Sequence, residues 1–246
     1  MSASAHTLFI SDLHLTADRP DISQQFLSFI QDSAPRAEAL YILGDLFEIW
    51  LGDDAMTPTH GIILNAIKSI SDRGISVYFM RGNRDFLIGD EFAKACGCEI
   101  LNDPSVINLY GTPTLLTHGD LLCTDDTDYQ AFRAYIRDPK TIKQLMALSI
   151  EERIAKGREY RAGSQAANKE KPMDIMDVNQ DAVLAMLREH NVEHMIMGHT
   201  HRPNEHSFEL EGKPAHRIVL GDWHEQGSQV YADASGCELQ ELVRRV

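Results

Sequence analysis

LFISDLHL at residues 8–15 and ALYILGDL at residues 39–46 decide the fold of this chain, because each joins a short apolar run to polar side chains. The runs LFIS and ALYIL suit buried strands, as do VYFM at 77–80, TLLT at 114–117 and HMIM at 194–197. A polar motif follows each run: D-L-H, G-D, G-N-R-D, H-G-D and G-H-T-H. Ligands of an open α/β sheet bind beyond the carboxyl ends of its strands, so we expect these motifs to converge.

The motifs carry the donors that a site for two metal ions needs. Aspartate, asparagine and histidine without thiolate suit Mn, Fe or Zn, and they argue against a Cys-rich structural zinc site. Two cations about 3.5 to 4 Å apart need a shared anion, which Asp45 can supply as a bridging carboxylate. We assign one ion to Asp12, His14, Asp45 and His201, and the other to Asp45, Asn83, His118 and His199. An isolated histidine would more often be structural, but five ordered motifs reverse that expectation.

The five motifs resemble the pattern of the calcineurin-like metallophosphoesterases, which is D-x-H, G-D, G-N-H-[DE], H and G-H-x-H. The resemblance covers residues 7–201 and implies a sandwich of two mixed β-sheets flanked by helices. It departs at Arg84, where most of the superfamily has a histidine that is often taken as a general acid. A guanidinium does not release a proton near neutrality, so Arg84 can only stabilise phosphate charge and hold geometry. The alternative is that Arg84 merely pairs with Asp85 or Asp120.

The lack of a general acid has a consequence for the substrate. A phosphate monoester, whose second pKa is about 6, can leave without being protonated, whereas an alkoxide cannot. We therefore expect a phosphoanhydride substrate. Asp45 and Arg84 are the candidate catalytic residues, and Asp120 is a candidate to orient His118 from behind.

Length and composition indicate a soluble enzyme of one domain. A chain of 246 residues with 43% apolar content can bury roughly 70 to 75% of its unfolded surface, so we expect one domain over residues 1–246 and no obligate protein partner. The net charge of -14 argues against nucleic-acid binding, which rests on Lys and Arg. The four cysteines form no C-x-x-C pair, and neither a signal peptide nor a membrane span is visible. We therefore expect a cytoplasmic protein.

The rest of the pattern predicts a mixed α+β/α/β fold with an insertion. Helical periodicity at 22–32 and 59–72 predicts a βαβαβ start with parallel strands, and 107–118 and 208–221 each predict two antiparallel strands around a turn. Residues 125–172 are helical instead, and ten basic residues oppose five acidic ones between Arg133 and Lys171. This insertion is either a helical hairpin packed on the body with solvated charges, or a lid that holds acyl chains over the site.

Longer stretches resemble one group within the superfamily, the UDP-2,3-diacylglucosamine pyrophosphohydrolases of lipid A biosynthesis. The stretches are FISDLHL, LYILGDLFE, GNRDFLIG, HGDLLCTDDTDYQAFR, IMDVN and GHTHRP. The resemblance implies two Mn²⁺ ions, with Fe or Zn as alternatives, and water attack on the uridine-side phosphorus that yields UMP and 2,3-diacylglucosamine 1-phosphate. It also implies substrate contacts by Asn83, Arg84, Asp126, Ser164, Asn168, Lys171 and His199. Taken singly, Asp126, Ser164 and Asn168 would more often be helix caps, and Lys171 a solvated charge.

Two other functions are compatible with the motifs. A soluble nucleotide phosphodiesterase would share the metals but would gain nothing from an apolar and basic insertion. A non-catalytic scaffold of this fold would be expected to lose metal ligands, and all seven are present. A lipidic UDP-sugar substrate and the basic insertion together predict peripheral contact with the anionic cytoplasmic face of the inner membrane.

Overall fold

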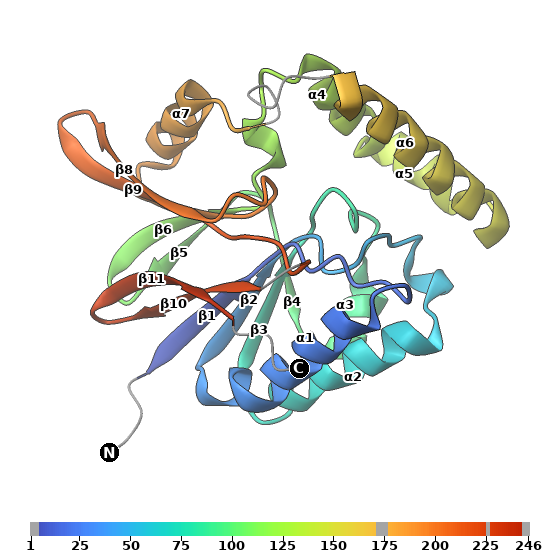
Figure 1. The fold of residues 1–246 in the computed structure, drawn as a ribbon, viewed down its shortest axis with the longest axis horizontal. Coiled ribbons are helices and arrows are strands. Elements are labelled where there is room, and N and C mark those ends of the chain that lie inside the picture. The colour runs from blue at the N-terminus through green and yellow to red at the C-terminus, as the bar shows by residue number, and fades with distance from the viewer. Residues whose placement is uncertain (1–4, 171–176, 225–226, 243–246) are drawn as a thin grey trace.

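Two mixed sheets form the centre of the structure, a computed structural model that describes residues 5–170, 177–224 and 227–242, with the α6 side chains described as far as Gly163 (Figure 1). The first sheet has the order β11-β10-β1-β2-β3-β4, in which β1 to β4 are parallel. Its strands are β1 His6–Ile10, β2 Ala39–Leu43, β3 Ser76–Met80, β4 Glu99–Leu101, β10 Ser228–Asp233 and β11 Gly236–Glu241.

The second sheet has the order β5-β6-β7-β9-β8. Its inner strands β6, β7 and β9 are parallel, and β5 and β8 are antiparallel at its two edges. Its strands are β5 Ser105–Leu109, β6 Thr112–Thr117, β7 His194–Met197, β8 Asn204–Leu210 and β9 Lys213–Val219. The parallel start, the two antiparallel pairs and the mixed sheets predicted from the sequence are therefore confirmed.

Helices cover the outer face of each sheet (Figure 1). Those on the first sheet are α1 Pro20–Asp32, α2 Pro58–Ser71 and α3 Asp90–Cys96, and α7 Gln180–His190 lies on the second. Short 3-10 turns occur at η1 Ala34–Arg36, η2 Asp53–Ala55 and η3 Asp120–Leu122. The side chain of Thr57 accepts from the His60 amide, and the His60 ring accepts in return from the Thr57 amide, so α2 begins with a reciprocal cap. None of the described helices combines the length and apolarity needed to cross a bilayer.

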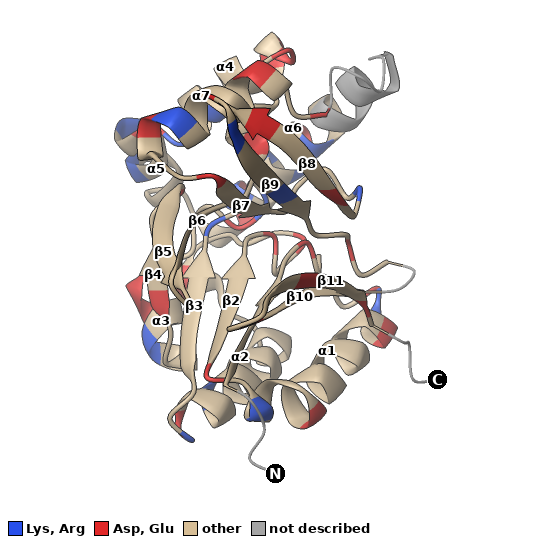
Figure 2. Ribbon diagram, turned by 90° about the vertical axis from the view of Figure 1, so that its left-hand side faces the viewer, with Lys and Arg blue, Asp and Glu red and all other residues tan. Residues whose placement is uncertain are grey.

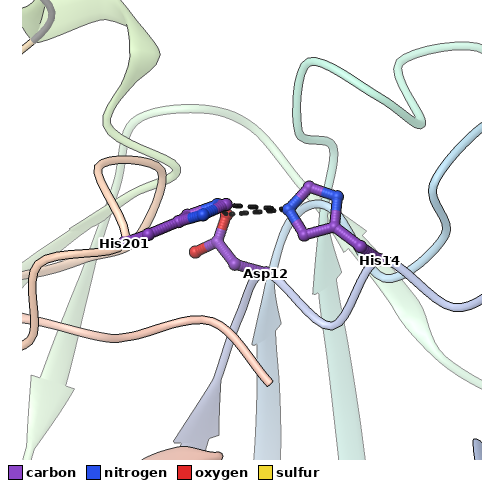
Figure 3. Close-up of side chains that lie close together, drawn as sticks. All are labelled: Asp12, His14 and His201. Atoms are coloured by element: carbon purple, nitrogen blue, oxygen red, sulfur yellow. Dashed lines mark hydrogen bonds and ion pairs between the residues drawn. The ribbon is translucent and has the colours of Figure 1, made fainter. Parts of the chain in front are cut away.

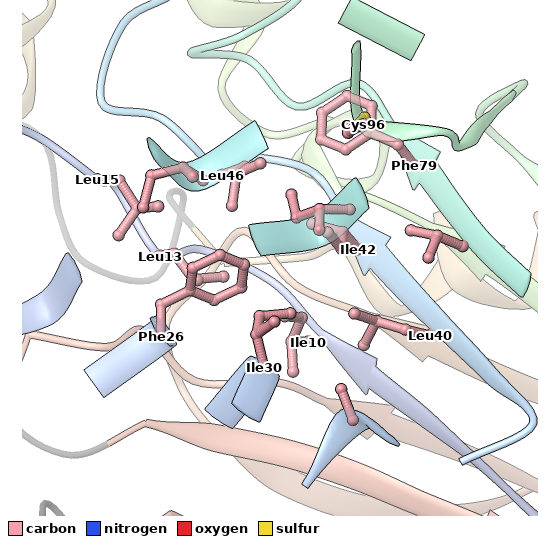
Figure 4. Packing of buried hydrophobic residues seen from close by; sticks show 14 of the residues in the cluster. Ile10, Leu13, Leu15, Phe26, Ile30, Leu40, Ile42, Leu46, Phe79 and Cys96 are labelled. Atoms are coloured by element: carbon pink, nitrogen blue, oxygen red, sulfur yellow. The ribbon is translucent and has the colours of Figure 1, made fainter. Parts of the chain in front are cut away.

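Three apolar layers hold the elements together, and strand alternation divides the side chains among them. Ile10 of β1 packs in a cluster with Phe26 and Leu40 on the side of α1 and α2 (Figure 4). Leu8 belongs to the same cluster. Phe9, between them in sequence, points the other way into the layer between the two sheets. A third layer packs α7 against the second sheet. The inner strands are thus buried on both faces, which explains their continuous apolar runs.

Three helices separate β6 from α7, namely α4 Thr127–Ile136, α5 Pro139–Met146 and α6 Ile150–Glu170, and they lie beyond the carboxyl ends of the strands (Figure 1). In Figure 2 the blue ribbon segments that mark Lys and Arg include positions on these helices. Four of the ten basic residues counted in the sequence instead form ion pairs with carboxylates of the body. These are Arg133 and Arg137 with Asp120, Arg153 with Asp54, and Arg161 with Glu48. These four arginines therefore hold the insertion against the body through ion pairs.

Candidate metal centre

The ends of five strands bring the seven predicted ligands together, in two halves. In one half, His14 Nε2 lies 3.1 Å from His201 Nε2. In the other, the side-chain oxygen of Asn83 lies 2.9 Å from His118 Nε2 and 2.9 Å from His199 Nδ1. Residues that are up to 189 positions apart in the sequence are thus neighbours in space, as predicted.

Two aspartates lie between the histidines. Asp45 places Oδ2 3.8 Å from His14 Nε2 and Oδ1 3.7 Å from His118 Nε2, so one oxygen faces each half. Asp12 Oδ1 lies 3.4 Å from His201 Nε2, and Figure 3 shows this carboxylate between the His14 and His201 rings. Two groups of residues have ligand atoms within 4.8 Å of one another, Asp12 with His14 and His201, and Asp12 with Asp45 and His118. Asp12 therefore also approaches the second half, to which we had not assigned it.

The chemistry of this donor set fits divalent metal ions. His118 Nδ1 lies 2.9 Å from the Leu43 carbonyl, His14 Nδ1 lies 3.0 Å from Glu48 Oε2, and His201 Nδ1 lies 3.1 Å from Asp222 Oδ2. An acceptor beside Nδ1 favours a proton on that nitrogen, which would leave the lone pair of Nε2 directed into the cluster. Two such lone pairs meet at 3.1 Å between His14 and His201, where a cation or a proton is required between them.

The backbone is strained at the residues that carry these ligands. Positive φ angles occur at Asp12 (57°), His14 (51°), Asp45 (52°), His199 (72°) and His201 (56°). A positive φ is uncommon outside glycine and costs about 1–3 kcal/mol at each position, so surrounding contacts must enforce it. Asp12 N donates to the Gly44 carbonyl at 3.1 Å and His14 N to the Asp45 carbonyl at 3.0 Å. The loops after β1 and β2 therefore hold each other in the conformation that aims the ligands.

Asp85 anchors two of the ligand loops from below. Its side chain is fully buried and accepts from the amides of Gly82 at 2.8 Å, Leu46 at 2.8 Å and Asp45 at 3.3 Å. Burial and the neighbouring Asp45 raise the pKa of Asp85 to about 7. Backbone amides thus occupy both carboxylate oxygens, and the alternative in which Arg84 pairs with Asp85 is wrong.

Charge within the cluster sets the pKa of its histidines. Burial lowers the pKa of His118, but Asp45, Asp12 and Asp120 outweigh burial and raise it to about 9. Burial likewise opposes the charged form of His201, yet Asp12 and Asp222 raise its pKa to about 10. Burial and the adjacent His118 lower the pKa of His199 to about 4. Protons and metal ions would therefore compete for the same nitrogens.

Asp120 does not hold His118, contrary to the prediction. The two ring nitrogens of His118 are directed at the Leu43 carbonyl and at Asn83. Asp120 Oδ2 instead accepts from Tyr129 Oη at 3.0 Å, Arg133 Nε at 2.8 Å and Arg137 Nη2 at 3.4 Å. Within the described part of the chain, Asp120 forms its ion pairs with Arg133 and Arg137 and not with Arg84, the pairing that we had left open. The sequence placed Asp120 next to the expected loop, but the partly buried Arg133 of α4 and Arg137 just after it donate to Oδ2 of Asp120 instead.

A cavity of about 460 Å³ opens over the cluster of predicted ligands. Arg84 lines it, and the Arg84 Nε is buried with no hydrogen-bond partner among the described residues. Asp126 also lines it and caps α4 by accepting from the Tyr129 amide at 3.0 Å. The insertion adds an apolar wall that includes Phe132, Ile136 and Tyr160. The side chains of Ser164 and Asn168, and the whole of Lys171, lie outside the described residues.

Sequence reasoning missed the residues that stand behind the ligands. Glu48 and Asp222 contact the outer nitrogens of His14 and His201. Glu48 follows Asp45 by three positions in LYILGDLFE, and that proximity was a usable signal. Asp222 lies on the loop between β9 and β10, where no motif marks it. Arg137, which donates to the Gly82 carbonyl at 2.9 Å, belongs to a segment that we had considered mainly for its charge.

The fold and this cluster define a metallophosphoesterase. The family model described as calcineurin-like phosphoesterase matches residues 5–203, and the chain belongs to that family. A curated relative from Stenotrophomonas maltophilia (strain K279a), named UDP-2,3-diacylglucosamine hydrolase, is 50% identical over 97% of this chain and 99% of its own. Relatives of the same name from Pseudomonas paraeruginosa and Enterobacter sp. (strain 638) are 52% and 51% identical, over 93% and 95% of this chain and 95% and 97% of theirs.

Solved structures with lower similarity were also found. A conserved protein from Streptococcus pneumoniae described as a predicted phosphoesterase has a TM-score of 0.48 at 14% identity, covering 99% of this chain and 92% of its own. Vps29 from Entamoeba histolytica, solved with zinc, has a TM-score of 0.46 at 16% identity, covering 96% and 98%. The family assignment rests on the match over residues 5–203 and on the relatives at about half identity.

Proposed function

We propose that the chain hydrolyses the pyrophosphate bond of UDP-2,3-diacylglucosamine. A single observation carries the proposal: one cavity is lined both by five of the seven proposed ligands and by apolar side chains of the insertion. A nucleotide sugar with acyl chains needs both surfaces, whereas a soluble phosphodiester needs only the first. The name shared by relatives at about half identity supports the same substrate.

The proposed ligands are Asp12, His14, Asp45 and His201 for one ion and Asp45, Asn83, His118 and His199 for the other. We propose Mn²⁺ for both, because the set combines carboxylate and amide oxygens with imidazoles and lacks thiolate. When bound, such a pair polarises a phosphoryl group and activates water for attack. Asp45 would hold the two ions together, which its two inward-facing oxygens support. The strained ligand loops would fix this geometry before the substrate enters.

Arg84 would stabilise the diphosphate. Its guanidinium lines the cavity, and its amide donates to Asp45 Oδ1 at 2.8 Å, which ties its position to the proposed bridging carboxylate. Water would form a new P–O bond at the uridine-side phosphorus while the P–O bond of the anhydride breaks. UMP then carries the oxygen from water, and 2,3-diacylglucosamine 1-phosphate leaves as a phosphate monoester. Such a leaving group needs no proton from Arg84.

The insertion would hold the acylated part of the substrate. Apolar surface beside the cluster comes from Phe132 and Ile136 of the insertion and from Ile49 and Phe86 of the body. Each methylene removed from water contributes about 0.8 kcal/mol, so partial enclosure of two acyl chains can dominate affinity. We propose that residues 125–172 act as this lid within a single domain of residues 1–246. Asp126, Ser164, Asn168, Lys171 and His199 remain the proposed further contacts to the sugar and phosphates.

We also propose that the protein is cytoplasmic and meets the inner membrane peripherally through the insertion. Apolar side chains on its surface include Phe132 (38% exposed), Tyr135 (53%), Met146 (37%) and Ile150 (36%). An amphipathic surface of this kind can insert at a lipid interface, and exposed Lys140 and Lys143 would face anionic headgroups. Flotation with anionic vesicles tests the contact, and failure to float at low salt would refute it.

A direct assay tests the substrate and the reaction together. Purified protein is given acylated UDP-glucosamine or its deacylated form, with and without Mn²⁺, and UMP is measured. We expect UMP only with metal, much faster release from the acylated compound, and isotope from heavy-oxygen water in UMP. Equal rates on both compounds would favour a soluble nucleotide phosphodiesterase. Isotope in the sugar phosphate would refute attack at the uridine-side phosphorus.

A further inference from the structure

Glu48 lies between a proposed metal ligand and the insertion. Its Oε2 is 3.0 Å from His14 Nδ1, and its Oε1 is 2.7 Å from Arg161 Nη2 on α6. The side chain is only 15% exposed, and the His14 ring is 4% exposed. One carboxylate therefore uses its two oxygens on two different parts of the molecule.

The backbone fixes Glu48 relative to His14. Glu48 N donates to the Leu15 carbonyl at 3.1 Å, and Leu15 N donates to the Leu46 carbonyl at 2.9 Å. Leu15 and Phe47 also form a parallel bridge. Because the loops after β1 and β2 run side by side here, the carboxylate is held beside the outer nitrogen of His14. A carboxylate in this place fixes the tautomer and orientation of the ring and makes its inner nitrogen a better ligand.

One face of α6 carries the other contact. Arg153 donates to the Leu51 carbonyl and pairs with Asp54, and Gly157 leaves so little room that a Cβ there would lie 2.7 Å from Ile49 Cδ1. Arg161 is four residues further along, so these three residues lie on the same side of the helix. They face residues 48–54 of the body, and among the three contacts only that of Arg161 reaches a residue that touches a proposed metal ligand.

We propose that Glu48 is a positioning residue that couples the metal centre to the insertion, so that one carboxylate both orients His14 and docks α6 beside the cavity. The inference rests on the proposed metal centre. It adds that metal affinity depends on Glu48, which is not itself a proposed ligand. Loss of the contact between Glu48 Oε2 and His14 should lower metal affinity. Substitution of either Glu48 or Arg161, which form the Oε1 contact, should weaken the docking of α6.

Binding of Mn²⁺ to the apoprotein, measured by calorimetry, separates these contacts. Glu48→Gln keeps an acceptor for His14 but loses the charge, and Glu48→Ala loses both. Substituting a residue that orients a metal ligand typically reduces metal affinity about 10- to 100-fold. We therefore expect Mn²⁺ affinity to fall about 10-fold in Glu48→Gln and about 100-fold in Glu48→Ala. Arg161→Ala should keep Mn²⁺ affinity while it speeds amide exchange in α6 and raises KM more than it lowers kcat.

Matched controls come from the same helix. Arg158→Ala removes an exposed cation one turn from Arg161, and Glu159→Gln removes an exposed carboxylate whose ion pair, among the residues that the structure describes, is with Lys156. Neither substitution should change Mn²⁺ affinity or the rate of amide hydrogen exchange near the cavity. Circular dichroism and the urea midpoint of each apoprotein show whether a variant is folded. If Glu48→Ala does not fold, the nearly isosteric Glu48→Gln still tests the proposal.

The outcomes are distinct. Wild-type affinity for Mn²⁺ in folded Glu48→Gln and Glu48→Ala would overturn the inference, as would an equal loss of metal in Arg161→Ala. Unchanged exchange in α6 after both Glu48→Gln and Arg161→Ala would overturn the docking half. If the wild-type protein itself binds no pair of metal ions, the proposed function fails first. If it binds them and releases UMP, a negative result for Glu48 concerns this inference alone.

Discussion

Replacing Asp85 by asparagine should destabilise the protein although Asp85 is not a proposed ligand. The carboxylate is fully buried and receives three backbone amides, from Gly82, Leu46 and Asp45. Asparagine keeps one acceptor oxygen and turns the other into a donor that faces an amide. An orphaned buried donor costs about 1–3 kcal/mol, and at a pH above the Asp85 pKa of about 7 hydrogen bonds to the charged group contribute about 1.5–3 kcal/mol each. Relief of the repulsion from Asp45 offsets part of this, so we expect a loss of about 2 kcal/mol.

Urea unfolding of the metal-free protein measures this loss without interference from metal binding. Chelator-treated wild type, Asp85→Asn and a surface control, Asp72→Asn, are followed by circular dichroism. Asp72 is 61% exposed and pairs with Lys68, so its substitution should change stability by less than about 1 kcal/mol. If Asp85→Asn unfolded at the wild-type midpoint with an unchanged slope, the buried amides would not depend on this carboxylate, and our view of how the ligand loops are held would be refuted.

Three further substitutions test other parts of the site. Asp45→Ala should abolish both metal ions together, which metal analysis of the purified variant would show; retention of one tightly bound ion would contradict the bridge. Gly82→Ala should also lose metal, because a Cβ there would collide with Asp45 Oδ1. The matched Gly163→Ala adds a Cβ with no described atom within 4 Å, so it should behave as wild type. Arg153→Met should leave the Leu51 carbonyl without its donor at a cost of about 1–3 kcal/mol, and proteolysis should then cut α5 or α6 faster; an unchanged pattern would argue against this anchor.

The convergence of the proposed ligands could be predicted because its signals are local. Each motif directly follows a strand whose apolar run is visible in the sequence, and parallel strands bring their carboxyl ends to one edge of a sheet. Nothing about distant packing was needed to expect Asp12 near Asp45. The antiparallel pair β8 and β9 was equally accessible, because a glycine turn joins two short apolar runs.

Other features depend on which distant segments meet, and the sequence does not reveal them. β10 lies beside β1 because residues 228–233 return from the far end of the chain. Asp222 reaches His201 from the loop before that strand, with no motif around it. Asp120 was expected to serve His118, but the choice of its partner depends on where α4 places Arg133 and Arg137. Which charged groups pair depends on the tertiary structure. Here it leads Asp120 to pair with Arg133 and Arg137 and not with His118, which is nearer in the sequence.

The same pairing of charges changes how the basic insertion should be understood. The sequence shows an excess of positive charge there, which favours contact with an anionic surface. Arg133, Arg137, Arg153 and Arg161 nevertheless pair with carboxylates of the body, and two of these pairs converge on Asp120 directly behind the Gly82 loop. An acidic body thus attracts its own cationic insertion, and this holds the apolar wall of the cavity against the metal cluster. Pairing of these four arginines leaves fewer cations for an anionic surface, so we expect the exposed aromatic and aliphatic side chains to contribute a larger share of the proposed membrane affinity.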